Sequence, residues 1–180
     1  MNKSEITQLL AECGEILEIS GASPFRVRAF QQGSRALENW QGDLDQLVEE
    51  DQVTSIRGIG KGLSSIIRDL ATSGVSEEEA EIRALVPESL LELLRIPGLG
   101  PKKVRAIHQE LGILTIAELE AACFQQQIRE LAGFAERTEN VILKGIKNLR
   151  RFAGRSLLSV SGLVATRFLQ SLQRCPAVDQ

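Results

Sequence analysis

The sequence predicts an all-α protein of two small domains. Apolar residues recur at helical spacing through much of the 180-residue chain, and no stretch alternates for long enough to indicate a strand. Short turns rich in glycine or proline separate these stretches, and Ser, Thr or Pro stands at several of the expected helix starts. A chain of this length buries enough apolar surface for one domain or two small ones.

The first two helices are predicted from their start and stop signals. One covers residues 4–19 and ends at Gly21. The second begins with Ser23 as its cap and Pro24 in its first turn, where the missing N–H costs nothing. We expect its apolar face, which includes Phe25, to point inward.

Later helices carry similar signals. Ser76 followed by Glu79 has the pattern of a capping box, in which each side chain accepts an N–H of the other residue's backbone. Thr115 followed by Glu118 has the same pattern. The predicted helices after residue 42 cover residues 43–49, 63–72, 76–85, 87–94, 101–111, 115–122, 138–152 and 156–173.

A glycine turn joins two of these helices. Residues 96–103 read Ile-Pro-Gly-Leu-Gly-Pro-Lys-Lys. Gly98 and Gly100 permit backbone angles closed to other residues and let another molecule approach the bare chain. The N–H groups of the turn and the positive end of the next helix then point outward beside Lys102 and Lys103. Such an arrangement favours the binding of an anion.

The same layout recurs twice at a similar period. Residues 56–62 read Ile-Arg-Gly-Ile-Gly-Lys-Gly, and residues 131–137 read Leu-Ala-Gly-Phe-Ala-Glu-Arg, with Ala135 in place of the second glycine. An amphipathic stretch follows each copy, which indicates a repeated supersecondary unit. The layout resembles the helix-hairpin-helix, a module that grips the DNA backbone without reading sequence. Any single copy is also compatible with an ordinary corner between two helices.

The net charge of −3 is unevenly distributed. Residues 1–100 hold nine basic and seventeen acidic residues, a balance of −8, whereas residues 101–180 hold twelve and seven, a balance of +5. The potential that attracts phosphates is therefore concentrated in the second part, although a solvated face would give the same split. In the acidic part, Arg26, Arg28 and Arg35 offer cations to phosphate or simply offset nearby acids.

The sequence does not indicate a membrane protein or a secreted protein. The sequence holds no run of eighteen apolar residues and no charged-then-apolar leader. Cys13, Cys123 and Cys175 form an odd and widely spaced set, which is typical of reduced thiols rather than of disulfides or a metal cluster. We expect a cytoplasmic, nucleoid-associated protein.

The order of the motifs resembles the N-terminal part of bacterial family X DNA polymerases, which are relatives of DNA polymerase beta. Residues 23–30, 56–62 and 93–103 carry the resemblance, which runs from about Lys3 to Val178. It implies a lyase-like helical domain over 1–75 with the first hairpin, a thumb-like domain over 76–153 with the second and the degenerate third, and a C-terminal helix over 154–180 that leads to a palm.

The resemblance also implies which catalytic groups to look for. No Gly-Ser motif followed by a paired-aspartate strand is present, so we expect no polymerase activity from this polypeptide alone. The amine nucleophile of the family's lyases would fall at Ile66 and its supporting tyrosine at Phe30. A further lysine aligns with Arg26, whose guanidinium cannot act as a nucleophile. We therefore predict no catalytic residue. The enzymatic alternative is a 5′-deoxyribose phosphate lyase that uses a displaced lysine such as Lys61.

The expected activity is sequence-independent binding to the backbone of gapped, nicked or duplex DNA. A protein-interaction adaptor is the other alternative, and a separate palm or another repair protein is a possible partner. No cofactor is required, but in relatives the carbonyls of such hairpins hold a monovalent cation, which implies a Na⁺ or K⁺ site at Thr54, Ile56, Ile59, Leu94, Ile96 and Leu99. The predicted DNA-binding residues are Gly58, Gly60, Lys61, Gly62, Gly98, Gly100, Lys102, Lys103, Arg105, Gly133, Arg137 and Arg26.

Overall fold

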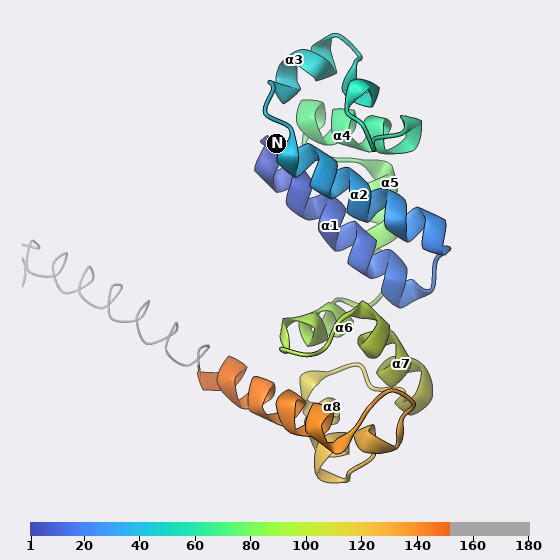
Figure 1. Cartoon of the computed structure of the whole chain (residues 1–180), viewed down its shortest axis with the longest axis vertical. Coiled ribbons are helices and arrows are strands. Elements are labelled where there is room, and N and C mark those ends of the chain that lie inside the picture. The colour runs from blue at the N-terminus through green and yellow to red at the C-terminus, as the bar shows by residue number, and fades with distance from the viewer. Residues whose placement is uncertain (152–180) are drawn as a thin grey trace, which may run out of the picture. The chain divides into compact units, whose positions relative to one another are not determined.

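The computed structural model describes residues 1–151, and within them it contains helices and no strand (Figure 1). The predicted all-α fold is therefore confirmed. A last helix begins at residue 136 and continues through residue 151, and the predicted helix over 156–173 lies outside the described residues. The other elements are α1 (Lys3–Ser20), α2 (Pro24–Asn39), α3 (Leu44–Glu49), the 3₁₀ turn η1 (Val53–Ser55), α4 (Lys61–Ser73), α5 (Glu77–Arg83), α6 (Glu88–Glu92), η2 (Leu93–Arg95), α7 (Pro101–Leu111), α8 (Ile116–Phe124) and η3 (Ile128–Glu130).

The chain divides into two compact units. The first unit comprises Met1–Leu94 and Leu99–Leu119, and the second comprises Arg95–Gly98 and the described residues from Glu120 onward. Helix α5 belongs to the first unit, where it packs on α1. The predicted boundary after residue 75 thus falls inside the first unit, and the functional division into two domains stays a prediction.

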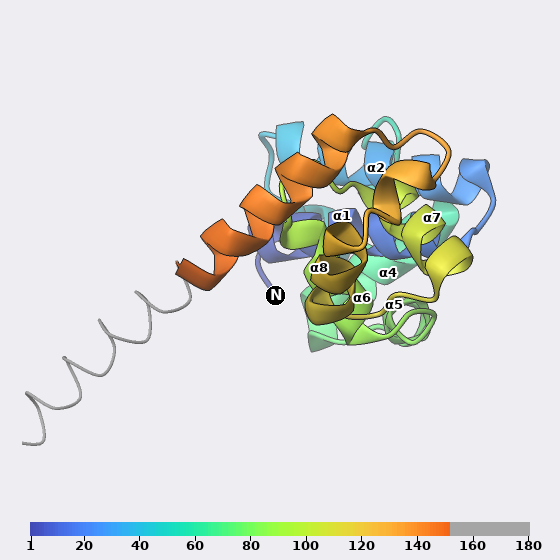
Figure 2. The same ribbon diagram turned by 90° about the horizontal axis from the view of Figure 1, so that it is seen from below.

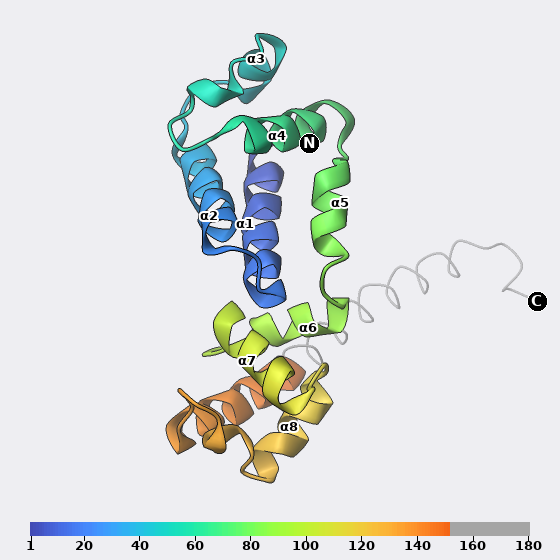
Figure 3. The same ribbon diagram turned by 90° about the vertical axis from the view of Figure 1, so that its right-hand side faces the viewer.

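The core of the first unit lies between α1, α2 and α4. Helices α1 and α2 run side by side, and α4 crosses one end of the pair (Figure 3). Leu10, Leu37 and Ile67 are completely buried among them. Gly33 of α2 lets α4 come close, because a Cβ atom there would lie 2.5 Å from Leu63 Cδ2. The arrangement fixes the position of the first glycine turn, which immediately precedes α4.

The start of α2 differs from the prediction in one residue. Ser23 caps the helix as expected, and its Oγ accepts the N–H of Arg26 at 3.3 Å. Phe25, however, is 80% exposed, so the prediction that it points inward is wrong. Val27 and Phe30 take the inward positions instead. They lie on the helical stripe that faces α1, whereas the 3.6-residue period places Phe25, in the first turn, on roughly the opposite side of the helix.

The two predicted capping boxes have different outcomes. The N–H of Glu118 donates to Thr115 Oγ1 at 3.2 Å, and the N–H of Thr115 donates to Glu118 Oε2 at 3.1 Å, which confirms the second box. Backbone N–H groups of Leu114 and Thr115 hold the pKa of Glu118 below its usual range. At Ser76 the helix forms but the box does not, because its Oγ is buried and accepts no N–H from the helix.

The second unit is built around the 136–151 helix. Its Ile142 and Ile146 are completely buried. Glu139, in the first turn, is 1% exposed and accepts the backbone N–H of Arg129 at 3.1 Å and its Nη2 at 2.6 Å. A second ion pair, between Arg150 and Glu120 at 2.6 Å, joins α8 to this helix. Figure 2 shows the backbone of both helices. These contacts hold η3 and α8 against the helix. No helix within residues 1–151 is long and apolar enough to cross a membrane.

Candidate nucleic-acid interface

The predicted repeat is present in the backbone of all three glycine turns. Each turn follows a 3₁₀ segment, respectively η1, η2 and η3. The first glycine of each has a positive φ, 104° at Gly58, 89° at Gly98 and 81° at Gly133. Residues with side chains rarely adopt this conformation, so the turn itself requires glycine at these positions. We refer to the three turns and their flanking helices as the first, second and third hairpins.

The second glycine of the first two hairpins is not required by its backbone conformation. Gly60 and Gly100 have φ of −87° and −96° with extended ψ, which any residue can adopt. A Cβ atom at either position would meet no atom within 4 Å. The third hairpin makes the equivalent turn with Ala135, whose carbonyl accepts the N–H of Thr138 at 2.8 Å. The fold therefore does not require glycine at 60 or 100.

The helices that follow the first two hairpins begin without a side-chain cap. Gly60 precedes α4 and Gly100 precedes α7, and within the described residues no side chain accepts a capping hydrogen bond at either start. Such groups, together with the helix dipole, attract an anion. Lys61 is exposed in the first turn of α4. Lys102 is 86% exposed in α7, with its Nζ 4.0 Å from a carboxylate oxygen of Glu18.

Two predicted phosphate ligands have other contacts. Arg26 forms an exposed ion pair with Glu78 at 3.1 Å. Arg105 lies against Gly21 at the end of α1. A Cβ atom on Gly21 would come within 2.7 Å of Arg105 Nη2, and Arg105 Nε is buried with no hydrogen-bond partner among residues 1–151. Both guanidinium groups therefore contact helices of the first unit, and their role in binding stays a prediction.

Each of the first two hairpins rests on a helix that is distant in the sequence. A Cβ atom on Gly58 would lie 3.5 Å from the Cβ of Ala36 in α2. A Cβ atom on Gly98 would lie 3.1 Å from Cγ1 of Val141 in the 136–151 helix. Gly145, one turn further along, lies so close to Ile96 that a Cβ atom would be 2.9 Å from its Cγ2. Sequence reasoning missed these supporting helices, because no local pattern announces a contact over such a separation.

The positions that the resemblance assigns to lyase chemistry lie in the core. Ile66 is 1% exposed and Phe30 is 3% exposed, both within the first unit. The position of the family's amine nucleophile is thus filled by an apolar side chain packed inside the protein. Lys61, the displaced lysine of the enzymatic alternative, lies at the surface five residues earlier.

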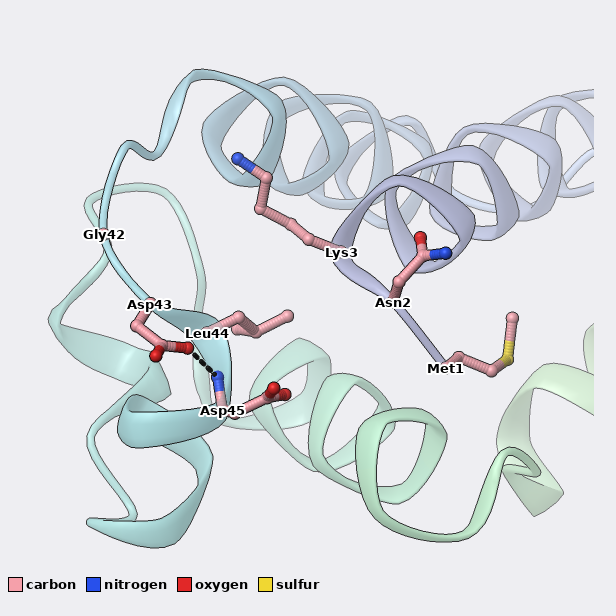
Figure 4. A pocket seen from close by; sticks show the side chains of 7 residues that line it. All are labelled: Met1, Asn2, Lys3, Gly42, Asp43, Leu44 and Asp45. Atoms are coloured by element: carbon pink, nitrogen blue, oxygen red, sulfur yellow. Dashed lines mark hydrogen bonds between the residues drawn. The ribbon is translucent and has the colours of Figure 1, made fainter.

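A pocket of about 430 Å³ opens near the starts of α1 and α3 (Figure 4). The polar groups that line it form hydrogen bonds to the backbone at helix ends. Asp43 accepts the N–H of Asp45 at 3.0 Å, and Lys3 Nζ donates to the carbonyl of Trp40 at 2.6 Å. Within residues 1–151 no group of three or more His, Cys, Asp or Glu is placed to hold a metal ion. The lining residues are Met1, Asn2, Lys3, Gly42, Asp43, Leu44 and Asp45.

Repeated glycine turns, each closing onto the start of a helix, define a helix-hairpin-helix protein. Residues 1–76 match the family described as "Helix-hairpin-helix domain", and residues 90–148 match the "SAM-like Helix-hairpin-helix tandem". The chain is 38% identical over 146 residues, 81% of its length, to the "DNA polymerase/3′-5′ exonuclease PolX" of Bacillus subtilis (strain 168). It spans 25% of that protein's length. The resemblance to the N-terminal part of bacterial family X DNA polymerases is thereby confirmed.

Proposed function

We propose that this chain binds the DNA backbone without sequence preference, as a module related to repair polymerases of family X. The observation that carries the proposal is the open space at Gly60 and Gly100, where the fold would tolerate a side chain and none is present. A bare backbone there lets phosphate oxygens reach the N–H groups at the starts of α4 and α7. The similarity to a protein named as a DNA polymerase supports DNA as the partner.

The hairpins would grip consecutive phosphates through hydrogen bonds from backbone N–H groups. Exposed cations beside them, Arg57 and Lys61 at the first hairpin and Lys102 at the second, add attraction at longer range. Contacts of this kind position a protein on DNA but carry no base information. Two DNA duplexes of unrelated sequence should therefore bind with similar affinity.

A monovalent cation at the hairpin carbonyls remains part of the proposal. The carbonyl of Ile56 accepts the N–H of Ile59 at 3.0 Å, and its second lone pair remains available to an ion. Such an ion would bridge the turn and a phosphate oxygen. Replacing K⁺ by tetramethylammonium at constant ionic strength tests this, because the bulky cation cannot be ligated by carbonyls. Unchanged affinity would rule the ion out.

We propose binding without catalysis for this chain, because the nucleophile position of the related lyases is the buried Ile66. Borohydride trapping on incised abasic DNA provides the test, since a covalent adduct requires a Schiff base to an amine. We expect no adduct, and an adduct at a lysine would establish the lyase alternative. A separate palm or another repair protein remains a proposed partner.

The main experiment is a titration of labelled duplex and gapped DNA by fluorescence anisotropy between about 50 and 200 mM salt. If about four phosphates are neutralised, log affinity should fall against log salt with a slope of about −3 to −4. Absence of binding at low salt, or binding that salt does not weaken, would contradict the proposal. Comparison of gapped, nicked and continuous duplexes then identifies the preferred form.

A further inference from the structure

The helix that supports the first hairpin carries two arginines around the contact point. Gly58 lies against Ala36 and against the backbone of Gln32 in α2. Arg28 precedes Gln32 by four residues, and Arg35 follows it by three, so all three side chains lie along one face of the helix. The turn of the first hairpin therefore rests on a ridge with a cation on each side.

The helix that supports the second hairpin repeats this register. Gly98 lies against Val141, which takes the place of Gln32. Arg137 precedes Val141 by four residues, and Lys144 follows it by three. Gly145 takes the place of Ala36 and is the small residue against which the turn packs. Two helices in different units thus carry the same pattern: a basic residue, the residue that contacts the turn four positions later, a second basic residue three positions after that, and a small residue next to it.

These four cations are exposed and have no acidic partner in the part of the chain that the structure describes. Most other arginines there are engaged with carboxylates, and the contrast is found on the same helices. Arg26 of α2 pairs with Glu78, and Arg150 of the 136–151 helix pairs with Glu120. An unpaired, exposed cation contributes more to the local potential than one beside a carboxylate. The arginines held in ion pairs are Arg26, Arg68, Arg83, Arg129 and Arg150.

We propose that the pairs Arg28 with Arg35 and Arg137 with Lys144 bind DNA phosphates on either side of the turns at Gly58 and Gly98, respectively. We call them the α2 pair and the 136–151 pair. This inference rests on the proposed function. Residues seven apart on a helix are separated by about 10.5 Å along its axis, at 1.5 Å per residue. That length is close to the rise of about three nucleotides of one strand, at 3.4 Å each, with the hairpin between the two cations.

The proposal also reassigns Arg137. In the sequence it follows the third hairpin, but in the structure it shares a helix face with the residue on which Gly98 rests. We therefore assign it to the turn at Gly98. The third hairpin has Ala135 and Glu136 where the first has Gly60 and Lys61, and both changes disfavour a phosphate at that turn.

Two double variants test the inference in the full chain, Arg28→Gln with Arg35→Gln and Arg137→Gln with Lys144→Gln. The control is Arg68→Gln with Arg150→Gln, which removes the same charge from guanidinium groups already held by Asp51 and Glu120. Each phosphate contact contributes about 0.9 to the salt slope, so each double variant should lower its magnitude by about 1.8. At about 0.1 M salt this corresponds to binding about 60-fold weaker. The control should keep the wild-type slope.

The outcomes separate this inference from the proposed function. If the wild-type chain does not bind DNA, the proposed function fails. If it binds with the expected slope and both double variants keep that slope, the inference is overturned and the proposed function stands. Loss in one variant only overturns the assignment for the other helix. An equal loss in the control overturns it for both, because the effect then follows total charge. Circular dichroism melting curves should coincide for the wild type and the two double variants, since Arg28, Arg35, Arg137 and Lys144 are exposed. The control loses two ion pairs, so its affinity is measured well below its own melting temperature.

Discussion

Replacing Gly60 and Gly100 by alanine separates the binding role of the hairpins from their role in the fold. Neither backbone conformation requires glycine, and the added methyl group would meet no protein atom within 4 Å. Two effects on stability oppose each other. Alanine restricts the unfolded chain, which stabilises by about 0.4–1 kcal/mol. As a helix cap it is worse than glycine by a similar amount. The free energy of unfolding should therefore change by less than about 0.5 kcal/mol.

The effect on DNA binding should be much larger. The methyl group occupies the space through which a phosphate would reach the first N–H groups of α4 or α7. Loss of one hydrogen bond to a charged oxygen costs about 1.5–3 kcal/mol. At about 1.4 kcal/mol per tenfold change, each variant should bind about 10- to 150-fold more weakly.

The assay pairs anisotropy titrations with urea denaturation of the same preparations. Ala135→Gly is the matched control, because it changes the equivalent position of a hairpin that already carries a methyl group, and its affinity should equal that of the wild type. Wild-type affinity in both Gly60→Ala and Gly100→Ala would refute the reasoning. Loss of affinity together with a large loss of stability would refute it as well, since glycine would then be serving the fold.

The remaining predictions concern stability. Gly145→Ala should lower the free energy of unfolding by about 1–3 kcal/mol in urea denaturation, because its Cβ atom would lie 2.9 Å from Ile96 Cγ2; no change would show that the contact is loose. Glu139→Gln should lower the free energy of unfolding, because it removes the buried carboxylate that accepts the backbone N–H and the guanidinium of Arg129; an unchanged value would contradict that pairing. Burial raises the pKa of Cys13 to about 12 and that of Cys123 to about 11, so the folded state holds these protons more tightly. The contribution of these thiols to the free energy of unfolding should be fully present below about pH 9 and should fall as the pH rises above it. Urea denaturation should therefore give a lower free energy of unfolding at about pH 10 than at about pH 8, and equal values would contradict the prediction.

The sequence predicts the local parts of this structure well. The spacing of apolar residues locates the helices, and the glycines locate the hairpins, since both signals arise from interactions between residues a few positions apart. Phe25 was misplaced because a helix start fixes which positions face inward only after the packing partner is known. Ser76 shows the same limit for capping, since the pattern is present and the hydrogen bond is absent. Local patterns therefore predict an element better than they predict its contacts.

The sequence predicts the hairpin turns of the candidate site but not the helices that support them, because only the turns depend on residues close together in the chain. The backbone of the site came from the glycine motifs, whereas the helices that support the hairpins depend on contacts between Gly58 and Ala36 and between Gly98 and Val141. These pairs are separated by more than twenty and more than forty residues, and no periodicity connects them. The basic residues on the supporting helices could be noticed in the sequence, but their relation to the hairpins could not.

Under the proposed function, net charge would be a poor guide to where DNA binds. The balance of −8 over residues 1–100 pointed to the later part of the chain. In the structure, however, several acidic residues within 1–100 form ion pairs, such as Glu12 with Arg83 and Asp51 with Arg68. The cations near the first hairpin are left without such partners among residues 1–151. Because the field at a phosphate depends on the charges nearest to it, an acidic half can still present a basic surface at its hairpin. A salt slope lowered by about 1.8 in the α2 double variant would demonstrate this directly.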